Sequence, residues 1–188
     1  MSDENYFEYL KTRSKLAHLY RRNVVYPGIN GFLNGKVLDI GCGIGDFLSF
    51  RKNTIGADVN PFIVDYCNGL GYEAHLIKNG VFPFQNNTFE GAVLDNVLEH
   101  LVDPQSTLTE ISRILKHKGR LVIGVPGILG YQKDDDHKVF YEENEMIELL
   151  AKCGFVKVDF IYRPFYFRSQ FLSRKVSQYC IYGVFELQ

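Results

Sequence analysis

Tryptophan is absent from this 188-residue chain, which contains only four cysteines and two methionines. The cysteines lie far apart, and none belongs to a Cys-x-x-Cys pair, which disfavours both a zinc ribbon and a small disulfide scaffold. We therefore expect reduced thiols and a cytoplasmic protein. The four residues are Cys42, Cys67, Cys153 and Cys180.

The chain also lacks long apolar runs and an excess of charge of either sign. No run approaches the roughly 20 apolar residues that a membrane-spanning helix needs, so we expect no membrane span. The polar segment 1–5 lacks the apolar centre of a signal peptide. The formal net charge is -1, so nucleic acid is not an expected partner. The 46% hydrophobic content is enough for the core of one domain.

Strand-like and helix-like segments alternate through most of the chain. This alternation predicts crossover connections and a mostly parallel sheet, because helices separate the strands. Residues 164–178 have no clear period and predict a loop or a short helix. The expected strands are 36–40, 53–58, 73–77, 91–95, 120–125, 155–162 and 179–187, and the expected helices are 46–51, 61–68, 103–116 and 142–152.

The N-terminal segment has its own pattern. Residues 5–22 carry apolar positions at helical spacing, which predicts an amphipathic helix over the main domain, and Pro27-Gly28 is expected to break it. We therefore divide the chain into an N-terminal helix or lid, 1–34, and a domain, 35–188. If the lid closes, its basic residues have the charge to hold a substrate phosphate or carboxylate, although a solvated face is the default interpretation. These residues are Lys11, Arg13, Lys15, Arg21 and Arg22.

The most informative segment is an apolar strand that ends in an acid and is followed by three alternating glycines. Glycines allow a sharp bend and the close approach of a ligand, and Cys42 is small enough to fit within the bend. The N–H groups at the next helix start favour negative charge, whereas Asp39 attracts positive charge. A ligand with a cationic centre, a carboxylate and a nucleoside satisfies all three features, and S-adenosylmethionine is such a ligand. The glycines are Gly41, Gly43 and Gly45.

The segment Asp39 to Gly45 resembles the first motif of the class I S-adenosylmethionine-dependent methyltransferases, which is an acid, one residue and Gly-x-Gly-x-Gly. The resemblance covers residues 35–160 and is nearest to small-molecule enzymes of the quinone-biosynthesis type, often called type 11. It implies a three-layer, Rossmann-like α/β fold with a seven-stranded, mostly parallel sheet and an antiparallel last strand. It also implies S-adenosylmethionine as cofactor and a small-molecule methyl acceptor.

Three further residues are candidates for contact with the nucleoside. Asp58 ends the second expected strand, where an acid can bind both ribose hydroxyls, and the resemblance gives it that role. Capping of the next helix is the alternative. Val59 lies beside Asp58 and is included with it. Many relatives have an acid after the third strand that binds the adenine amino group, whereas this chain has Asn79, whose side chain still offers an acceptor.

The segment after the fourth expected strand lies beside the expected methyl group. Asp95 and Asn96 are therefore candidate cofactor residues, and relatives often have a pair similar to Glu99-His100. A neutral His100 near a substrate hydroxyl is able to accept its proton as the methyl group moves. The alternative is that Glu99 or His100 only binds a nearby backbone group.

The charged run Asp134–His137 resembles a metal cluster at first sight. Consecutive side chains point in different directions, so the run favours a solvated loop, and we predict no metal site. Relatives carry a comparable Asp-His after the fifth strand, over the substrate pocket. His137 is therefore the second candidate for substrate contact or proton transfer.

Two other functions remain as alternatives. A nicotinamide-dependent oxidoreductase has a similar strand, turn and helix, but its Gly-x-Gly-x-x-Gly fingerprint places the third glycine at Asp46, whose charge would repel a pyrophosphate. A module that binds S-adenosylmethionine without catalysis is the other, because a fold does not guarantee activity. O-, N- and C-methylation all stay open, as does the oligomeric state.

Overall fold

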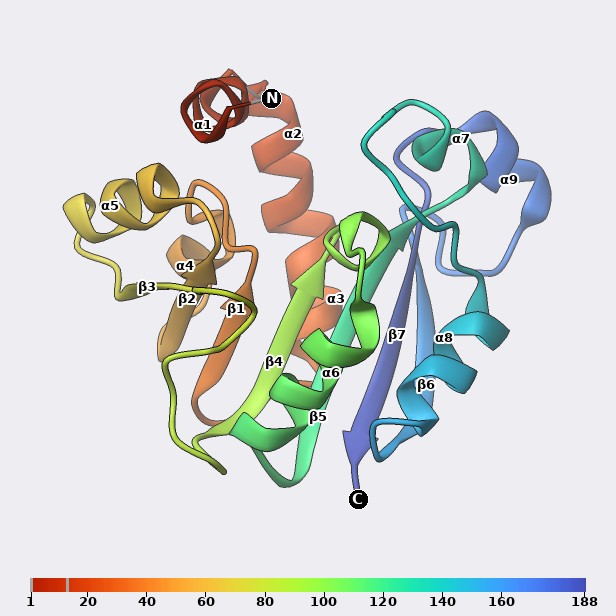
Figure 1. The fold of residues 1–188 in the computed structure, drawn as a ribbon. Coiled ribbons are helices and arrows are strands. Elements are labelled where there is room, and N and C mark those ends of the chain that lie inside the picture. Colours follow the sequence, from red (N-terminus) through yellow and green to blue (C-terminus); the bar gives the residue numbers. More distant parts are fainter. Residues whose placement is uncertain (1, 13) are drawn as a thin grey trace.

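A computed structural model of the protein describes residues 2–12 and 14–188, and its centre is a seven-stranded sheet with helices on both faces (Figure 1). The strand order is β3-β2-β1-β4-β5-β7-β6. The last strand, β7, runs antiparallel to both β5 and β6, and the remaining neighbours pair in parallel. The expected three-layer fold with an antiparallel last strand is confirmed. The strands are β1 Val37–Ile40, β2 Thr54–Asp58, β3 Ala74–Leu76, β4 Phe89–Asp95, β5 Leu115–Pro126, β6 Phe155–Arg163 and β7 Cys180–Leu187.

The helices mostly lie where the sequence predicts them. Asn60 caps α5 by accepting a hydrogen bond from the Phe62 N–H at 3.0 Å. Within residues 164–178 the structure has one short helix, α9. The helices are α1 Asp3–Lys11, α2 Lys15–Tyr20, α3 Tyr26–Asn30, α4 Asp46–Phe50, α5 Pro61–Gly69, α6 Pro104–Ile114, α7 Ile128–Tyr131, α8 Glu143–Ala151 and α9 Gln170–Lys175, with a π-helical turn η1 Arg21–Val25 and a 3-10 turn η2 Leu98–His100.

The N-terminal segment differs from the single helix expected over residues 5–22. It forms α1 and α2, and Ser14 begins the second by accepting a hydrogen bond from the Ala17 N–H at 3.2 Å. The expected break at Pro27-Gly28 is wrong. Pro27 lies in the first turn of α3, directly after η1, in which the Tyr26 N–H donates to the Arg21 carbonyl, and helical backbone therefore runs from α2 through η1 into α3. Arg13 of the basic group lies outside the described residues.

The second difference is the boundary between α6 and β5. The expected helix 103–116 ends at Ile114, and β5 begins at Leu115, which pairs with Phe89 of β4. The Thr88 N–H also donates to the Ile114 carbonyl at 2.8 Å. Pairing with β4 therefore overrides the local helical tendency of these residues.

Alternate residues of the central strands supply the two faces of the core. Leu38, Ala92 and Leu121 pack toward α6 and α8, whereas Val37 and Val93 pack toward α3 and α4. A third cluster joins α1 to α5 and to the segment after β1. None of the helices in the described ranges has the length and apolar character that a membrane crossing requires. Because β1, β2 and β4 are parallel, their carboxyl ends meet at one edge, below α1 and α2 in Figure 1.

Gly124 of β5 provides space at this edge. A Cβ atom there would lie 2.7 Å from Oδ1 of Asp95 and would overlap the ring of Tyr182. We expect Gly124→Ala to lower the free energy of unfolding by about 1–3 kcal/mol, because overpacking forces both side chains to move. Urea unfolding measures this change. Gly69→Ala is the matched control, since a Cβ at Gly69 has nothing within 4 Å and should leave stability unchanged or slightly higher. Equal stability of Gly124→Ala and the unsubstituted protein would contradict the packing described.

Candidate functional site

The glycine turn connects β1 to α4 and has the backbone geometry that the sequence predicts. Gly41, Gly43 and Gly45 have φ values of +71°, +51° and +83°, which side chains other than glycine rarely adopt. A Cβ atom at Gly41 would lie 2.5 Å from Cγ2 of Val97. The side chain of Cys42 is buried in the core beside Gly56, so only its backbone is available to a ligand at the turn.

Asp58 is tied to this turn. Its carboxylate accepts hydrogen bonds from the N–H of Gly43 at 3.2 Å and from the N–H of Asn60 at 3.0 Å. Burial raises the pKa of Asp58, and these two hydrogen bonds act in the opposite direction. The side chain is thus held at the strand end and does not point to bulk solvent, since the residue is only 6% exposed.

The surface next to Asp58 is open. Val59 is 69% exposed, and Asn79 lies exposed in a turn between Lys78 and Val81, with a φ of +53°. A buried carboxylate beside an exposed apolar side chain and an amide matches the polar ribose and the flat base of a nucleoside.

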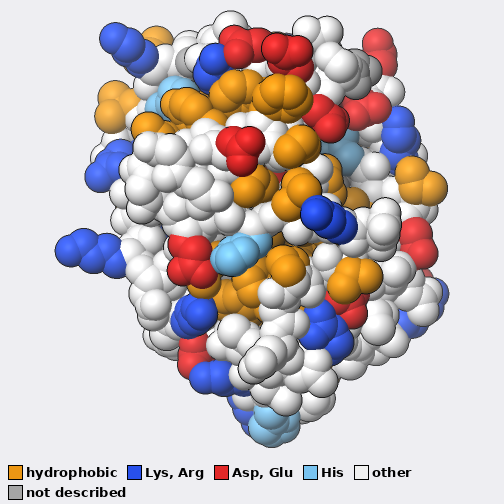
Figure 2. All heavy atoms as spheres, turned by 60° about the vertical axis from the view of Figure 1, so that its left-hand side comes forward, with side chains coloured by type: hydrophobic (Ala, Val, Ile, Leu, Met, Phe, Trp, Pro, Cys, Tyr) orange, Lys and Arg blue, Asp and Glu red, His pale blue; other side chains and the backbone are white. Residues whose placement is uncertain are grey.

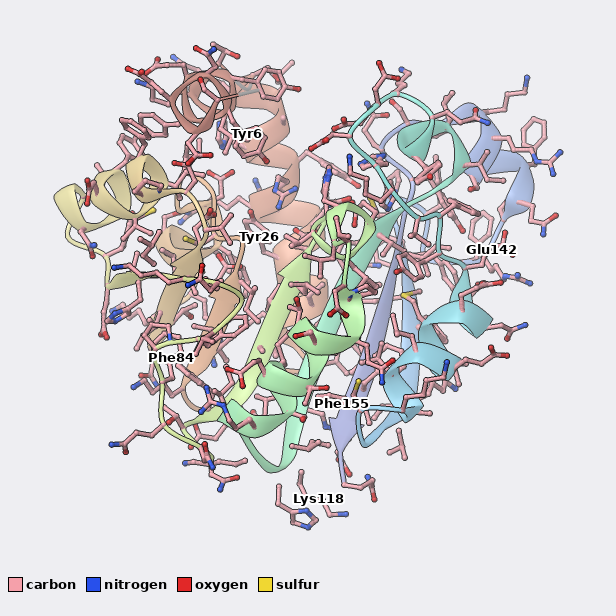
Figure 3. All side chains as sticks on the ribbon, viewed as in Figure 1. Tyr6, Tyr26, Phe84, Lys118, Glu142 and Phe155 are labelled. Atoms are coloured by element: carbon pink, nitrogen blue, oxygen red, sulfur yellow. The ribbon has the colours of Figure 1, made fainter. Side chains whose placement is uncertain are left out.

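The helix α1 covers the outer side of the turn. Cδ1 of Leu10 would lie 3.8 Å from a Cβ atom placed at Gly43, and Phe7 stacks on Phe62 of α5 at 6.5 Å between ring centroids. The Asn60 side chain donates to the Asp3 carbonyl at 2.7 Å. Figure 2 shows hydrophobic side chains gathered on the upper half of the face that carries α5. In Figure 3, Tyr6 marks the position of α1 above the strand ends.

Asp39 lies among other carboxylates. Burial, together with the charges of Asp95, Asp58 and Asp46, raises its pKa to about 8, although Arg21 acts in the opposite direction. The side chain is nearly inaccessible, with 5% of the residue exposed. This grouping of carboxylates disfavours an anion and favours a cation.

Asp95 is the centre of a hydrogen-bonded network at the end of β4. Its Oδ2 lies 2.6 Å from Nη2 of Arg21, and its Oδ1 accepts from the Tyr182 hydroxyl at 3.0 Å and from the Asn96 amide at 2.9 Å. Arg21 also donates to the Tyr26 hydroxyl at 2.9 Å. The N-terminal segment therefore reaches into the strand ends through one guanidinium.

Sequence reasoning missed two of these partners. Arg21 was only one member of a basic group, and Tyr182 was not singled out at all. They lie 74 and 87 residues from Asp95 in the sequence, so no local pattern indicated the contacts.

The two candidate histidines lie together. The ring centroids of His100, on η2, and His137, in the loop after α7, are 4.7 Å apart. Hydrogen bonds from the N–H groups of Lys138 and Val139 to the Glu99 carbonyl, at 2.7 and 3.3 Å, bring the two segments together. Burial lowers the pKa of His100, and His137 adds to this effect. A neutral imidazole at His100 is thus favoured near pH 7.

The acidic residues near these two histidines differ in their exposure to solvent. Asp134, Asp135 and Asp136 are exposed, which confirms the interpretation of that run as a solvated loop. Glu99, in contrast, is 1% exposed, and burial raises its pKa to about 8. The side chain of His137 is thus buried, whereas the acids of the same loop are exposed at its edge, with a carboxylate oxygen of Asp134 4.0 Å from Nε2 of His137.

Comparisons with known proteins agree with this geometry. A family model described as "Methyltransferase domain" matches residues 38–123. The chain is 29% identical over 114 residues to a tRNA (carboxymethyluridine(34)-5-O)-methyltransferase of Xenopus tropicalis, which covers 55% of this chain and 18% of the relative. It is 30% identical over 98 residues to a ubiquinone/menaquinone biosynthesis C-methyltransferase of Desulfotalea psychrophila, which covers 47% of this chain and 40% of the relative. The chain spans 66%, 48% and 18% of the lengths of the first three curated relatives that it matches, which is less than two thirds of each.

A solved structure is similar over the full length. It is an S-adenosylmethionine-dependent methyltransferase of Thermotoga maritima, described as a possible histamine N-methyltransferase, with a TM-score of 0.77 and 20% identity, over 99% of this chain and 98% of that chain. At this identity the likeness establishes the fold. The match of residues 38–123 to the methyltransferase domain model agrees with this fold, and the similar structure is described as dependent on S-adenosylmethionine. The chain is therefore similar in sequence and in fold to S-adenosylmethionine-dependent methyltransferases.

Proposed function

We propose that this protein transfers a methyl group from S-adenosylmethionine to an oxygen, nitrogen or carbon atom of a small molecule. The observation that carries the proposal is the meeting of Asp39, Asp58 and Asp95 at the carboxyl ends of β1, β2 and β4, beside the glycine turn. A cofactor with an ammonium and a sulfonium group relieves the repulsion among these carboxylates.

Each part of the cofactor has residues that suit it. Asp58 would hold the ribose hydroxyls, and Val59 and Asn79 would contact the adenine. The glycine turn would admit the amino-acid part close to its backbone, with Asp39 nearby as the counter-charge. Asp95 and its neighbour Asn96 would lie near the sulfur.

The cofactor supplies an electrophilic methyl group, and the protein supplies alignment and exclusion of water. For an oxygen acceptor we propose that His100 accepts the proton, with His137 as the second candidate. Segment 1–34 would act as the lid, because α1 covers the turn and Arg21 binds Asp95 from above. When the lid moves, Arg21 becomes available to a substrate carboxylate or phosphate.

A small acceptor is favoured over RNA by the charge of the protein. The net charge of -1 gives little general attraction to a phosphate backbone. Four free cysteines agree with a cytoplasmic site of action. Methyl transfer to unfractionated tRNA but to no small molecule would reverse this choice. Binding of S-adenosylhomocysteine without transfer to any acceptor would favour the non-catalytic module instead.

The first prediction concerns Asp58. Asp58→Ala should weaken the binding of S-adenosylhomocysteine by at least about tenfold, because a lost charge-assisted hydrogen bond costs about 1.5–3 kcal/mol. Isothermal titration calorimetry measures the change. Asp65→Ala, an exposed acid on α5, is the matched control and should bind as the unsubstituted protein does. Equal affinity in both variants would remove Asp58 from the site.

The second prediction concerns the proton that cofactor binding releases from Asp39. The pKa of Asp39 is raised to about 8, so this carboxyl is largely protonated at pH 7 in the free protein. A bound cation favours the ionised form, so binding should release a proton below pH 8 and tighten as the pH rises toward 8. Calorimetry in buffers of different ionisation enthalpy measures the released proton. Asp39→Asn should abolish the part that comes from this group, and an unchanged release would contradict the assignment.

The third prediction concerns His100 and an oxygen acceptor found in a panel of phenols and acids. Because the pKa of His100 is lowered from 6.5, the imidazole stays neutral at pH 7, and kcat should fall only at pH values below about 6.5. His100→Ala should lower kcat by about 10²–10⁴-fold and remove that limb of the pH profile. His75→Ala, a histidine on β3, is the control. A profile of unchanged shape in His100→Ala would assign the proton to another group.

A further inference from the structure

Glu99 is a buried carboxylate without a local partner. Its side chain is 1% exposed, and neither of its oxygens has a hydrogen-bond partner among the described residues. A charged carboxylate is strongly unfavourable in this state unless a cation or hydrogen-bond donors balance it. A cation or a proton is therefore expected next to it, and the surrounding side chains indicate which.

His137 presents a ring nitrogen to Glu99. Its Nδ1 lies 2.8 Å from the Tyr131 carbonyl, which only accepts hydrogen bonds, so Nδ1 carries the hydrogen. In the neutral imidazole this leaves a lone pair on Nε2, which lies 3.8 Å from Oε1 of Glu99. Two acceptor atoms thus face each other at a distance too long for a hydrogen bond.

His100 completes the group. Its Nδ1 lies 3.4 Å from the Asp136 carbonyl, which favours the tautomer with a free Nε2. One ligand atom from each of Glu99, His100 and His137 lies within 4.8 Å of the other two. The side chain of His100 is 28% exposed, whereas that of His137 is 8% exposed, so the group is open to solvent on one side.

From this geometry we propose that Glu99, His100 and His137 form a binding site for a divalent ion of the zinc class. Two imidazoles and one carboxylate are the protein ligands of open zinc sites, in which a fourth position remains for water or substrate. The carbonyls of Tyr131 and Asp136 orient the two rings, as second partners of metal-bound histidines do. Bonds of about 2.0–2.2 Å would require the ligand atoms to approach one another to roughly 3.3 Å, so metal binding would move side chains of η2 and of the loop.

This site differs from the one that the sequence excluded. The three acids of the run Asp134–His137 are exposed, although Oδ2 of Asp134 lies 4.0 Å from Nε2 of His137 and Oδ2 of Asp136 lies 3.8 Å from Nδ1 of His100. The ligands come instead from two segments that the Lys138 hydrogen bond to Glu99 holds together. A contact between segments that are distant in the sequence brings the three ligands together, and the spacing of residues within one run does not reveal such a contact.

Metal binding goes beyond the methyl transfer proposed above and does not require it. In the metal-bound protein both imidazoles are ligands, so the proton-accepting role of His100 belongs to the metal-free protein. An ion with an open position would bind an acceptor oxygen and lower the pKa of its hydroxyl.

The test is titration of the chelator-treated protein with Zn²⁺ by calorimetry. We expect one ion per chain, and binding weakened at least about tenfold in both Glu99→Gln and His100→Asn. His75→Asn is the matched control, because His75 also contacts a carboxylate, that of Glu73 at 3.0 Å, but has no third ligand in the part of the chain that the structure describes. This variant should bind Zn²⁺ as the unsubstituted protein does. Substitution with Co²⁺ should give visible absorption bands that disappear in His100→Asn.

The proposal is overturned if the unsubstituted protein binds no stoichiometric Zn²⁺, or if Glu99→Gln and His100→Asn bind it equally well. In that case a shared proton, not a metal, balances Glu99. Circular dichroism checks that each variant folds, and the partly exposed position of His100 makes its variant the safer of the two. Binding of S-adenosylhomocysteine, measured on the same samples, tests the cofactor site separately, so the two proposals can fail independently.

Discussion

The repulsion among carboxylates at the ends of three parallel strands is the constraint on which the site depends. In the sheet, Ile40 of β1 pairs with Ala57 of β2 and with Leu94 of β4. Asp39 precedes Ile40 by one residue, whereas Asp58 and Asp95 follow the two paired residues by one. Three acids of neighbouring strands therefore share one edge of the sheet. Bringing like charges together costs free energy unless protons or cations balance them.

The protein balances each acid in a different way. Asp58 receives two backbone N–H groups, and Asp95 receives the guanidinium of Arg21 and the hydroxyl of Tyr182. No such hydrogen bond to Asp39 is found within the described residues, and burial, together with the neighbouring carboxylates, raises its pKa to about 8. The carboxyl of Asp39, next to the glycine turn, is therefore the one with which a cationic cofactor interacts most favourably. The fold and the electrostatics thus favour the same ligand.

The sequence was sufficient for features that depend on local patterns. Alternating segments predicted the sheet, and the spacing from Asp39 to Gly45 predicted a sharp turn, whose glycines have positive φ values in the structure. It was insufficient where distant segments decide the outcome. Pairing of Leu115 with Phe89 shortened α6, and the contacts of Arg21 with Asp95 and of His137 with Glu99 join segments that no local pattern connects.

The most direct measurement of the central claim is a crystal structure with S-adenosylhomocysteine. The account predicts the ribose hydroxyls on the carboxylate of Asp58, the amino-acid part against the backbone of Gly41 and Gly43, and the sulfur beside Asp95. Density for the ligand elsewhere, or a saturated protein in which Arg21 and Leu10 keep their present contacts and no ligand lies at the turn, would contradict it.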